Sequence, residues 1–255
     1  MIELRNVTFG YTDEPVLNDV SFIIPEGESR VIMGQSGSGK STILKLLLGL
    51  YQVDSGEILI DDEEITYLKE SDLRRVRRKM GMVFQEGALF DSQTVGENVG
   101  FYLIEHSDYD IEQVEQRVRE MLGYIGLEES IIDSLPDELS GGMQRRVAIA
   151  RALLSTAPKI MLYDEPTTGL DPESTTKVLE LMDKLTQKRN IATIVVTHQF
   201  LDALEISDKF ILIEQGRVAF DGSLSELRDS TEPRVLRFLE PFRESLRALD
   251  QKGFS

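Results

Sequence analysis

The sequence has no cysteine among its 255 residues, so disulfide bonds and cysteine-ligated metal centres are excluded. It also lacks any apolar run that approaches the roughly 18 to 20 residues needed to cross a bilayer. The first residues, MIELRNVTF, are interrupted by Glu3 and Arg5 and do not form the apolar segment of a signal peptide. We therefore expect a cytoplasmic chain that reaches a membrane only by binding an integral partner.

Positive charge is scarce as well. The chain carries 28 lysines and arginines against 45 aspartates and glutamates, a formal net charge of −17. A nucleic-acid-binding protein would normally present a basic face to neutralise phosphates, so we expect no nucleic-acid partner. One basic run exists at residues 74–79, and we interpret it as the solvated face of a helix. Hydrophobic residues, at 41%, suffice for a packed core.

Hydrophobic patterns predict alternating strands and helices. Residues 2–7 and 16–24 alternate between apolar and polar side chains, which favours an antiparallel sheet with one solvated face. Short apolar runs predict further strands at 29–34, 56–61, 81–84, 159–166 and 191–198, and a hairpin at 209–220. Helical spacing predicts helices at 111–126, 141–154 and 173–188. Strands that alternate with helices imply an α/β fold with a mostly parallel sheet.

A glycine-rich turn joins the strand at 29–34 to a helix. Its sequence, GQSGSGKS, matches the phosphate-binding pattern G-x-x-x-x-G-K-[ST] of a P-loop. Glycines allow backbone N–H groups to close around phosphates, and the helix N-terminus favours anions. Lys40 is expected to reach the β- and γ-phosphates of ATP, and Ser41 to bind Mg²⁺. The predicted ATP-binding residues of this turn are Gly34, Ser36, Gly37, Ser38, Gly39, Lys40, Ser41 and Thr42.

Two acidic residues end the strand at 159–166. A pair of acids at a strand end can be a solvated turn, but beside a P-loop it indicates the second half of a nucleotide site. We expect Asp164 to hold Mg²⁺ through water. Glu165 follows it, and we expect it to polarise the water that attacks the γ-phosphate.

The residues LSGGMQR at 139–145 distinguish among P-loop proteins. They resemble the LSGGQ signature of the ABC ATPase family, with Met143 at the glutamine position and Gln144 one place later. Several transporter subfamilies tolerate this change, so we do not interpret it as lost function. A phosphate-binding helix N-terminus and a plain helix cap by a serine use the same groups. The predicted phosphate contacts here are Ser140, Gly141 and Gly142.

The resemblance implies a homodimer in which the signature of one copy completes the P-loop site of the other. Tyr11 matches the family's aromatic residue that stacks on adenine, although a surface tyrosine in a turn remains an alternative. Gln85 matches the glutamine that touches Mg²⁺ and the attacking water, Asp171 lies in the D-loop motif LDP, and His198 matches the switch histidine on the γ-phosphate. Gln199 stands where the family usually has Asp, which puts little in doubt about hydrolysis.

The resemblance covers about residues 2–228 and implies a P-loop NTPase core with an N-terminal antiparallel β subdomain and an inserted α-helical signature subdomain. We expect an ABC ATPase domain at 1–228, with its core at 1–85 and 156–222 and its helical subdomain at 86–155.

A charged helical tail is expected at 229–255. Apolar residues recur in it at near-helical spacing: Val235, Phe238, Leu239, Phe242, Leu246 and Leu249. Pro241 must break or kink this helix because it cannot continue the backbone hydrogen bonds. We expect this apolar stripe to pack against the cassette or its dimer mate. Contact with a membrane surface is the alternative.

The stretch Gln85–Val99 faces the membrane partner in this family. Its pattern FQ-x-GALFDS-x-TV-x-ENV looks like the ATPases of Mla/Mce-type transporters, which handle phospholipids across the bacterial envelope. That likeness implies a permease that docks near Gln85–Val99, a lipid-binding Mce-type subunit, and a peripheral position on the cytoplasmic face of the inner membrane. The alternative is that Ala88, Leu89 and Phe90 line a groove for the helix of any permease.

Three other functions compete with phospholipid transport. An ABC transporter for amino acids or drugs would share the same ATP motifs. ABC ATPases that act on ribosomes or DNA usually carry two cassettes in one chain or long coiled coils, and neither feature is present. A regulator that only binds ATP would have lost Lys40, Asp164 or Glu165, all of which are intact.

Overall fold

The structure is a computed structural model that describes residues 1–156, 158–189, 191–244 and 246. The chain divides into two compact units, Met1–Leu73 with Val195–Ser255, and Arg74–Ile194. The chain passes from the first unit to the second within the helix α2 (Glu70–Arg77). It returns to the first unit within the strand β8 (Ala192–Thr197).

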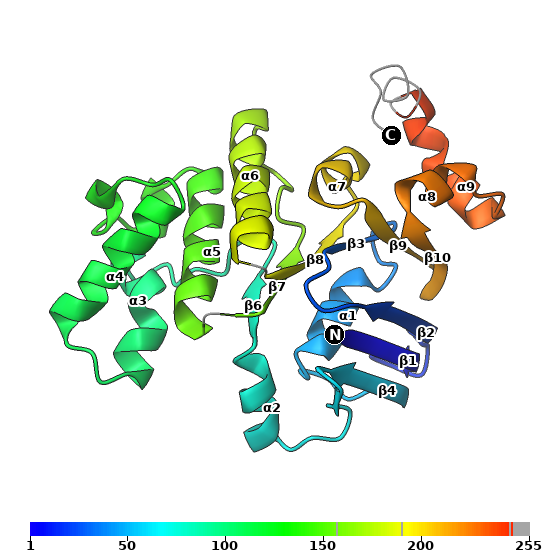
Figure 1. The fold of residues 1–255 in the computed structure, drawn as a ribbon, viewed down its shortest axis with the longest axis horizontal. Coiled ribbons are helices and arrows are strands. Elements are labelled where there is room, and N and C mark those ends of the chain that lie inside the picture. Colours follow the sequence, from blue (N-terminus) through cyan, green and yellow to red (C-terminus); the bar gives the residue numbers. More distant parts are fainter. Residues whose placement is uncertain (157, 190, 245, 247–255) are drawn as a thin grey trace. The chain divides into compact units, whose positions relative to one another are not determined.

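An antiparallel sheet opens the first unit (Figure 1). Its strands, in the order β2-β1-β4-β5, are β2 (Leu17–Ile24), β1 (Ile2–Phe9), β4 (Ser55–Ile60) and β5 (Glu63–Glu64). The predicted alternation is confirmed, because Ile2, Leu4, Ile24 and Ile60 are all buried and line one face. The sheet therefore has one apolar face, as the period of two in the sequence requires.

A second group of strands in the same unit carries the P-loop. The strand β3 (Arg30–Met33) runs parallel to β9 (Lys209–Glu214), which pairs with the antiparallel strand β10 (Arg217–Ser223). The helix α1 (Lys40–Leu47) follows β3 after the glycine-rich turn, and α7 (Phe200–Ile206) follows β8. The strands β3 and β9 are buried along most of their length, as their apolar sequences predict.

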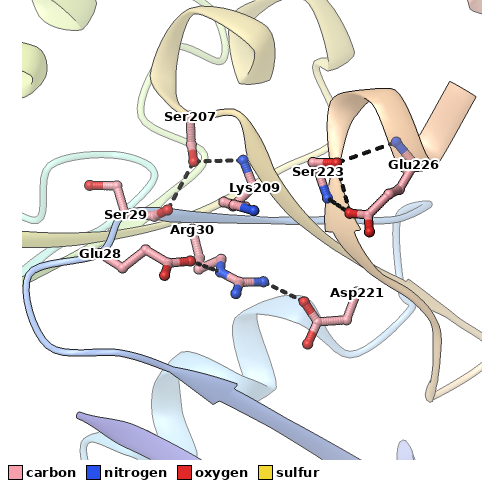
Figure 2. A network of polar contacts seen from close by, with 8 residues as sticks. All are labelled: Glu28, Ser29, Arg30, Ser207, Lys209, Asp221, Ser223 and Glu226. Atoms are coloured by element: carbon pink, nitrogen blue, oxygen red, sulfur yellow. Dashed lines mark hydrogen bonds and ion pairs between the residues drawn. The ribbon is translucent and has the colours of Figure 1, made fainter.

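Polar contacts fix the ends of β3, β9 and β10 to one another (Figure 2). The hydroxyl of Ser207 donates to the carbonyl of Ser29 at 2.9 Å and accepts the N–H of Lys209 at 3.0 Å. Arg30, the first residue of β3, forms an ion pair with Asp221 of β10. These contacts hold in place the strand that leads into the P-loop.

The second unit contains two parallel strands and a group of helices. The strand β6 (Met80–Val83) pairs with β7 (Ile160–Asp164), with Met80 opposite Ile160. The helices α3, α4 and α5 lie side by side (Figure 1). The helical elements of this unit are α3 (Val95–His106), α4 (Ile111–Tyr124), the 3-10 turns η1 (Glu129–Ile131) and η2 (Pro136–Glu138), α5 (Gly141–Thr156) and α6 (Pro172–Arg189).

The chain continues after β10 with two short helices, α8 (Leu224–Asp229) and α9 (Pro233–Leu239), and the 3-10 turn η3 (Glu240–Phe242). Both helices lie beside the β9–β10 hairpin (Figure 1). Ser223 caps α8, because its hydroxyl accepts the N–H of Glu226 while its own N–H donates to the Glu226 carboxylate at 2.7 Å (Figure 2).

The apolar stripe of the tail packs on α7. The ring of Phe242 stacks on Phe200 with centroids 4.8 Å apart, and Phe238 meets Phe200 edge-on at 6.2 Å. Three more stripe residues are buried: Val235, Leu239 and Leu246. The break predicted at Pro241 is confirmed, since α9 ends at Leu239. Leu249, the last residue of the predicted stripe, lies outside the described residues.

The α/β class, the N-terminal antiparallel sheet and the helical insertion are confirmed. Most predicted strand bounds lie within two residues of the observed ones; the strand predicted at 2–7, for example, extends to Phe9. The hairpin predicted at 209–220 is longer, because β10 continues to Ser223. The strand β5 and the helix α7 were not predicted. Both are short: β5 has 2 residues and α7 has 7, too few for a periodic pattern to stand out.

Candidate nucleotide site

The P-loop forms a turn around the side chain of Lys40. This side chain is only 6% exposed, and its ammonium group donates to the carbonyls of Gly34 at 2.9 Å and Gln35 at 3.0 Å. The loop backbone turns back on itself, with the N–H of Ser38 donating to Gln35 O at 3.2 Å. This arrangement is suited to polyphosphate, because the ammonium group and the positive N-terminal end of the helix dipole lie together.

Gly39 supplies the conformation that starts α1. It has a φ of 100°, and no side chain caps the first turn of the helix. A methyl group at this position would collide with the Leu17 side chain and come within 3.2 Å of Val16 O. The helix thus begins at a left-handed glycine where a residue with a side chain does not fit.

Tyr11 lies beside the first turn of α1. Its hydroxyl is 3.2 Å from the hydroxyl of Thr42, and its ring is 49% exposed. The ring meets Phe9 and Tyr51 edge-on, with centroid distances of 5.0 and 5.3 Å. Asp54 holds the preceding turn by accepting the N–H of Gly10 at 2.8 Å. Sequence reasoning missed both Tyr51 and Asp54, which have no motif of their own.

His198 directly follows β8 and is exposed. The turn that carries it is fixed by Thr197, whose hydroxyl accepts the N–H of Gln199 at 3.0 Å. Phe200 then starts α7 and is buried beneath the tail aromatics. His198 thus presents an exposed side chain from a turn that Thr197 and the buried Phe200 hold in place. The first unit holds Tyr11, the P-loop and His198 of the predicted residues.

Asp164 and Glu165 follow the buried strand β7. Glu165 is only 7% exposed and has a φ of 49°, in the left-handed region that costs a residue with a side chain about 1–3 kcal/mol. Its carboxylate accepts the hydroxyl of Thr168 at 3.1 Å, and its carbonyl accepts the N–H of Thr168 at 3.3 Å. Backbone strain of this kind clusters at active sites, which agrees with the role predicted for Glu165.

Gln85 is the second residue of the loop between β6 and α3, and it is exposed. Asn98 organises the far end of this loop from the first turns of α3. Its fully buried amide accepts the N–H of Phe90 at 2.8 Å and donates to the carbonyls of Phe90, Gln93 and Thr94 at 3.0 to 3.1 Å. Phe90 itself remains 43% exposed. The asparagine of the ENV pattern is therefore structural: it shapes the loop that presents Phe90.

Ser140 caps α5, and its hydroxyl accepts the N–H of Met143 at 3.3 Å. Gly142 is in tight contact with Ser174, in the first turn of α6, so a methyl group at position 142 would collide with it. Asp171 caps that turn by accepting the N–H of Ser174 at 3.0 Å, and hydrogen bonds from Ser174 hold the pKa of Asp171 below its ordinary value. The structure thus brings the predicted signature and D-loop together.

The backbone N–H of Gln144 donates to Ser140 O at 2.9 Å, while its side chain binds the preceding turn. Its amide donates to the carbonyls of Pro136 at 2.7 Å and Leu139 at 3.3 Å, which fixes the turn before the signature. The second unit holds Gln85, the signature, Asp164, Glu165 and Asp171 of the predicted residues. The residues predicted to bind Mg²⁺ carry hydroxyl, amide and carboxylate oxygens, the hard donors that this ion prefers: Ser41, Gln85 and Asp164.

Comparison with known proteins gives a consistent result. The profile of the ABC transporter family matches residues 17–168. The intermembrane phospholipid transport system ATP-binding protein MlaF of Haemophilus influenzae is 38% identical over 240 residues, which are 94% of this chain and 90% of that protein. The methionine import ATP-binding protein MetN of Carboxydothermus hydrogenoformans is 40% identical over 230 residues, 89% of this chain and 67% of that protein.

A solved structure shares the fold. The ATP-binding cassette MJ0796, in a dimeric post-hydrolysis state bound to ADP and Pi, superposes with a TM-score of 0.81 and 38% identity. The match covers 88% of this chain and 99% of that one. No helix among the described residues is long and apolar enough to cross a membrane.

Proposed function

The chain belongs to the ABC transporter family and is an ATPase, and we propose that it powers a transporter that moves phospholipids in the bacterial envelope. The proposal has two parts, a hydrolytic mechanism and a cargo. The enclosed ammonium group of Lys40 carries the first part. The loop from Gln85 to Val99 carries the second.

In the proposed mechanism Lys40 and the P-loop N–H groups hold the β- and γ-phosphates and offset the negative charge that develops during transfer. Glu165 accepts a hydrogen bond from the attacking water and takes up its proton. His198 holds the γ-phosphate. Phosphoryl transfer depends mainly on positioning and charge stabilisation, and the fixed turns around these side chains supply both.

Mg²⁺ is part of the proposed site. Ser41, Gln85 and Asp164 would hold it, and the bound ion supplies positive charge at the phosphate oxygens. Asp171 caps α6 beside the first turn of α5, and hydrogen bonds from Ser174 lower its pKa.

We propose that two copies enclose ATP, with Ser140 and Gly142 of one copy completing the P-loop site of the other. The first turn of α5 supports this role because its N–H groups form an anion-binding end and Gly142 adds no side chain there. The ABC transporter cassette MJ0796, which is 38% identical to this chain, is dimeric in its solved structure.

Tyr11→Ala is expected to raise the KM for ATP about 10-fold while kcat changes little, because base stacking on an aromatic ring is worth about 1–3 kcal/mol. Tyr11→Phe keeps the ring and should keep the wild-type KM. Steady-state ATPase assays with both variants test this. Tyr67→Ala, at another exposed tyrosine of the same unit, is the control. A wild-type KM for Tyr11→Ala would mean that adenine stacks elsewhere.

The phospholipid cargo rests on the loop that Asn98 shapes. Its pattern resembles Mla/Mce-type ATPases, and MlaF is among the similar proteins. The loop presents the ring of Phe90 at the surface, which provides an apolar contact for a permease helix. On this proposal the chain sits on the cytoplasmic face of the inner membrane beside the permease, in a complex that includes a lipid-binding Mce-type subunit.

An amino-acid importer is the second candidate, because MetN is as similar to the chain as MlaF. Affinity purification of the tagged chain from its native membrane, followed by mass spectrometry, separates the two. We expect a permease, an Mce-type subunit and bound phospholipid. Recovery of a soluble amino-acid receptor in the same complex would replace the phospholipid proposal by the importer.

A further inference from the structure

Two arginines of α5 hold the loop that carries Gln85. Arg145, only 6% exposed, donates its Nη1 hydrogen to the carbonyl of Phe84. Arg151 donates from Nη1 to Ala88 O at 2.8 Å and from Nη2 to Gly87 O at 3.0 Å. Three backbone carbonyls on both sides of Gln85 therefore accept hydrogen bonds from one helix.

Burial of the guanidinium groups that make these contacts costs desolvation free energy. Burial lowers the pKa of Arg145 and Arg151, and for Arg145 the nearby Glu86 carboxylate opposes that effect. The two hydrogen bonds of Arg151 replace water that burial removes from its guanidinium group. Arg145 keeps the bond to Phe84 O, while its buried Nε has no hydrogen-bond partner among the described residues. The five donors of Arg in a rigid fork suit two adjacent carbonyls, which a single ammonium group cannot satisfy in the same way.

The loop itself needs this support. Gly87 has a φ of 75° and Ala88 a φ of 49°, so two consecutive residues are left-handed. That conformation is strained for alanine and persists only where the surroundings hold it. Arg151 binds the carbonyls of these same two residues, and its guanidinium group lies 5.6 Å from the centre of the Phe90 ring.

We propose that Arg145 and Arg151 are positioning residues for Gln85. They fix the loop between Phe84 and Phe90 to the helix that Ser140 begins, so that Gln85 is held where hydrolysis needs it. This inference rests on the proposed role of Gln85. Neither arginine contacts nucleotide on this proposal; both act through the loop backbone.

The test is a double-mutant cycle on kcat. Arg151→Lys keeps the charge but loses the fork, and we expect kcat to fall about 10-fold with the KM for ATP within about twofold, because a small misplacement of a positioned group costs rate rather than affinity. Gln85→Ala should also lower kcat. If Arg151 acts through Gln85, the double variant is no slower than Gln85→Ala alone.

The cycle includes a second variant and a control. Arg145→Met removes the contact to Phe84 O and should lower kcat as Arg151→Lys does, which keeps the test valid if one variant folds poorly. Arg117→Lys is the control, because Arg117 donates to the Tyr109 hydroxyl within the α4 region and should leave kcat unchanged. Thermal unfolding and binding of a fluorescent ATP analogue show whether each variant is folded.

Two results overturn the inference. Wild-type kcat in both folded arginine variants would do so, and so would a loss that persists in full on the Gln85→Ala background. Either leaves the ATPase mechanism intact. A wild-type kcat for Gln85→Ala, in contrast, would remove the proposed role of Gln85 and the inference with it.

Discussion

Glu165→Gln is expected to lower kcat by about 10²–10³-fold while ATP still binds, since general-base catalysis contributes factors of this size. Glutamine has almost the same shape as glutamate and can keep the hydrogen bond from Thr168 that holds the strained turn. It cannot take up the proton of the attacking water. ATP that binds but does not react should then trap the dimer, which size-exclusion chromatography with light scattering detects.

Glu180→Gln, on the exposed face of α6, is the matched control and should hydrolyse ATP normally. ADP should not trap the dimer of either variant. A Glu165→Gln variant that stays monomeric with ATP and hydrolyses it at the wild-type rate would remove Glu165 from the mechanism.

Lys40→Ala is expected to abolish measurable hydrolysis and to weaken ATP binding at least about 100-fold, because charged hydrogen bonds of about 1.5–3 kcal/mol each are lost at the phosphates. The buried ammonium group donates to two loop carbonyls, so its removal also loosens the P-loop around the phosphates. Binding of a fluorescent ATP analogue and release of inorganic phosphate measure the two effects.

Lys45→Ala is the control for Lys40→Ala. Lys45 lies in the last turn of the same helix α1 and has no predicted contact with nucleotide. It should keep both binding and hydrolysis. If Lys40→Ala binds and hydrolyses ATP as Lys45→Ala does, the P-loop is not the nucleotide site.

Features with a local signal could be predicted from the sequence. Strand β1 follows from alternating side chains, and the P-loop from glycines that precede a lysine. The helix break before Pro241 follows from the missing N–H of proline. In each case the residues that carry the signal lie next to one another in the chain. The family resemblance then supplied roles for Gln85 and His198, which remain predictions.

Features that depend on distant partners could not be predicted. Arg145 and Arg151 bind backbone carbonyls, and a carbonyl has no sequence signature. Asp54 binds the N–H of Gly10, which lies 44 residues away in the sequence. Glu165 adopts a left-handed φ that its residue type disfavours. The contact of the tail with Phe200 could not be predicted for the same reason, because an apolar stripe does not indicate which surface it packs against.

The central claim is that each ATP lies between the P-loop of one copy and the signature of another. It is tested most directly by mixing two chains that both carry Glu165→Gln, one with Lys40→Ala and one with Ser140→Arg. The account predicts that ATP leaves each chain monomeric alone but traps a heterodimer in the mixture, because one complete site then forms. A mixture that stays monomeric, or an ATP-trapped dimer of the Ser140→Arg chain alone, would contradict it.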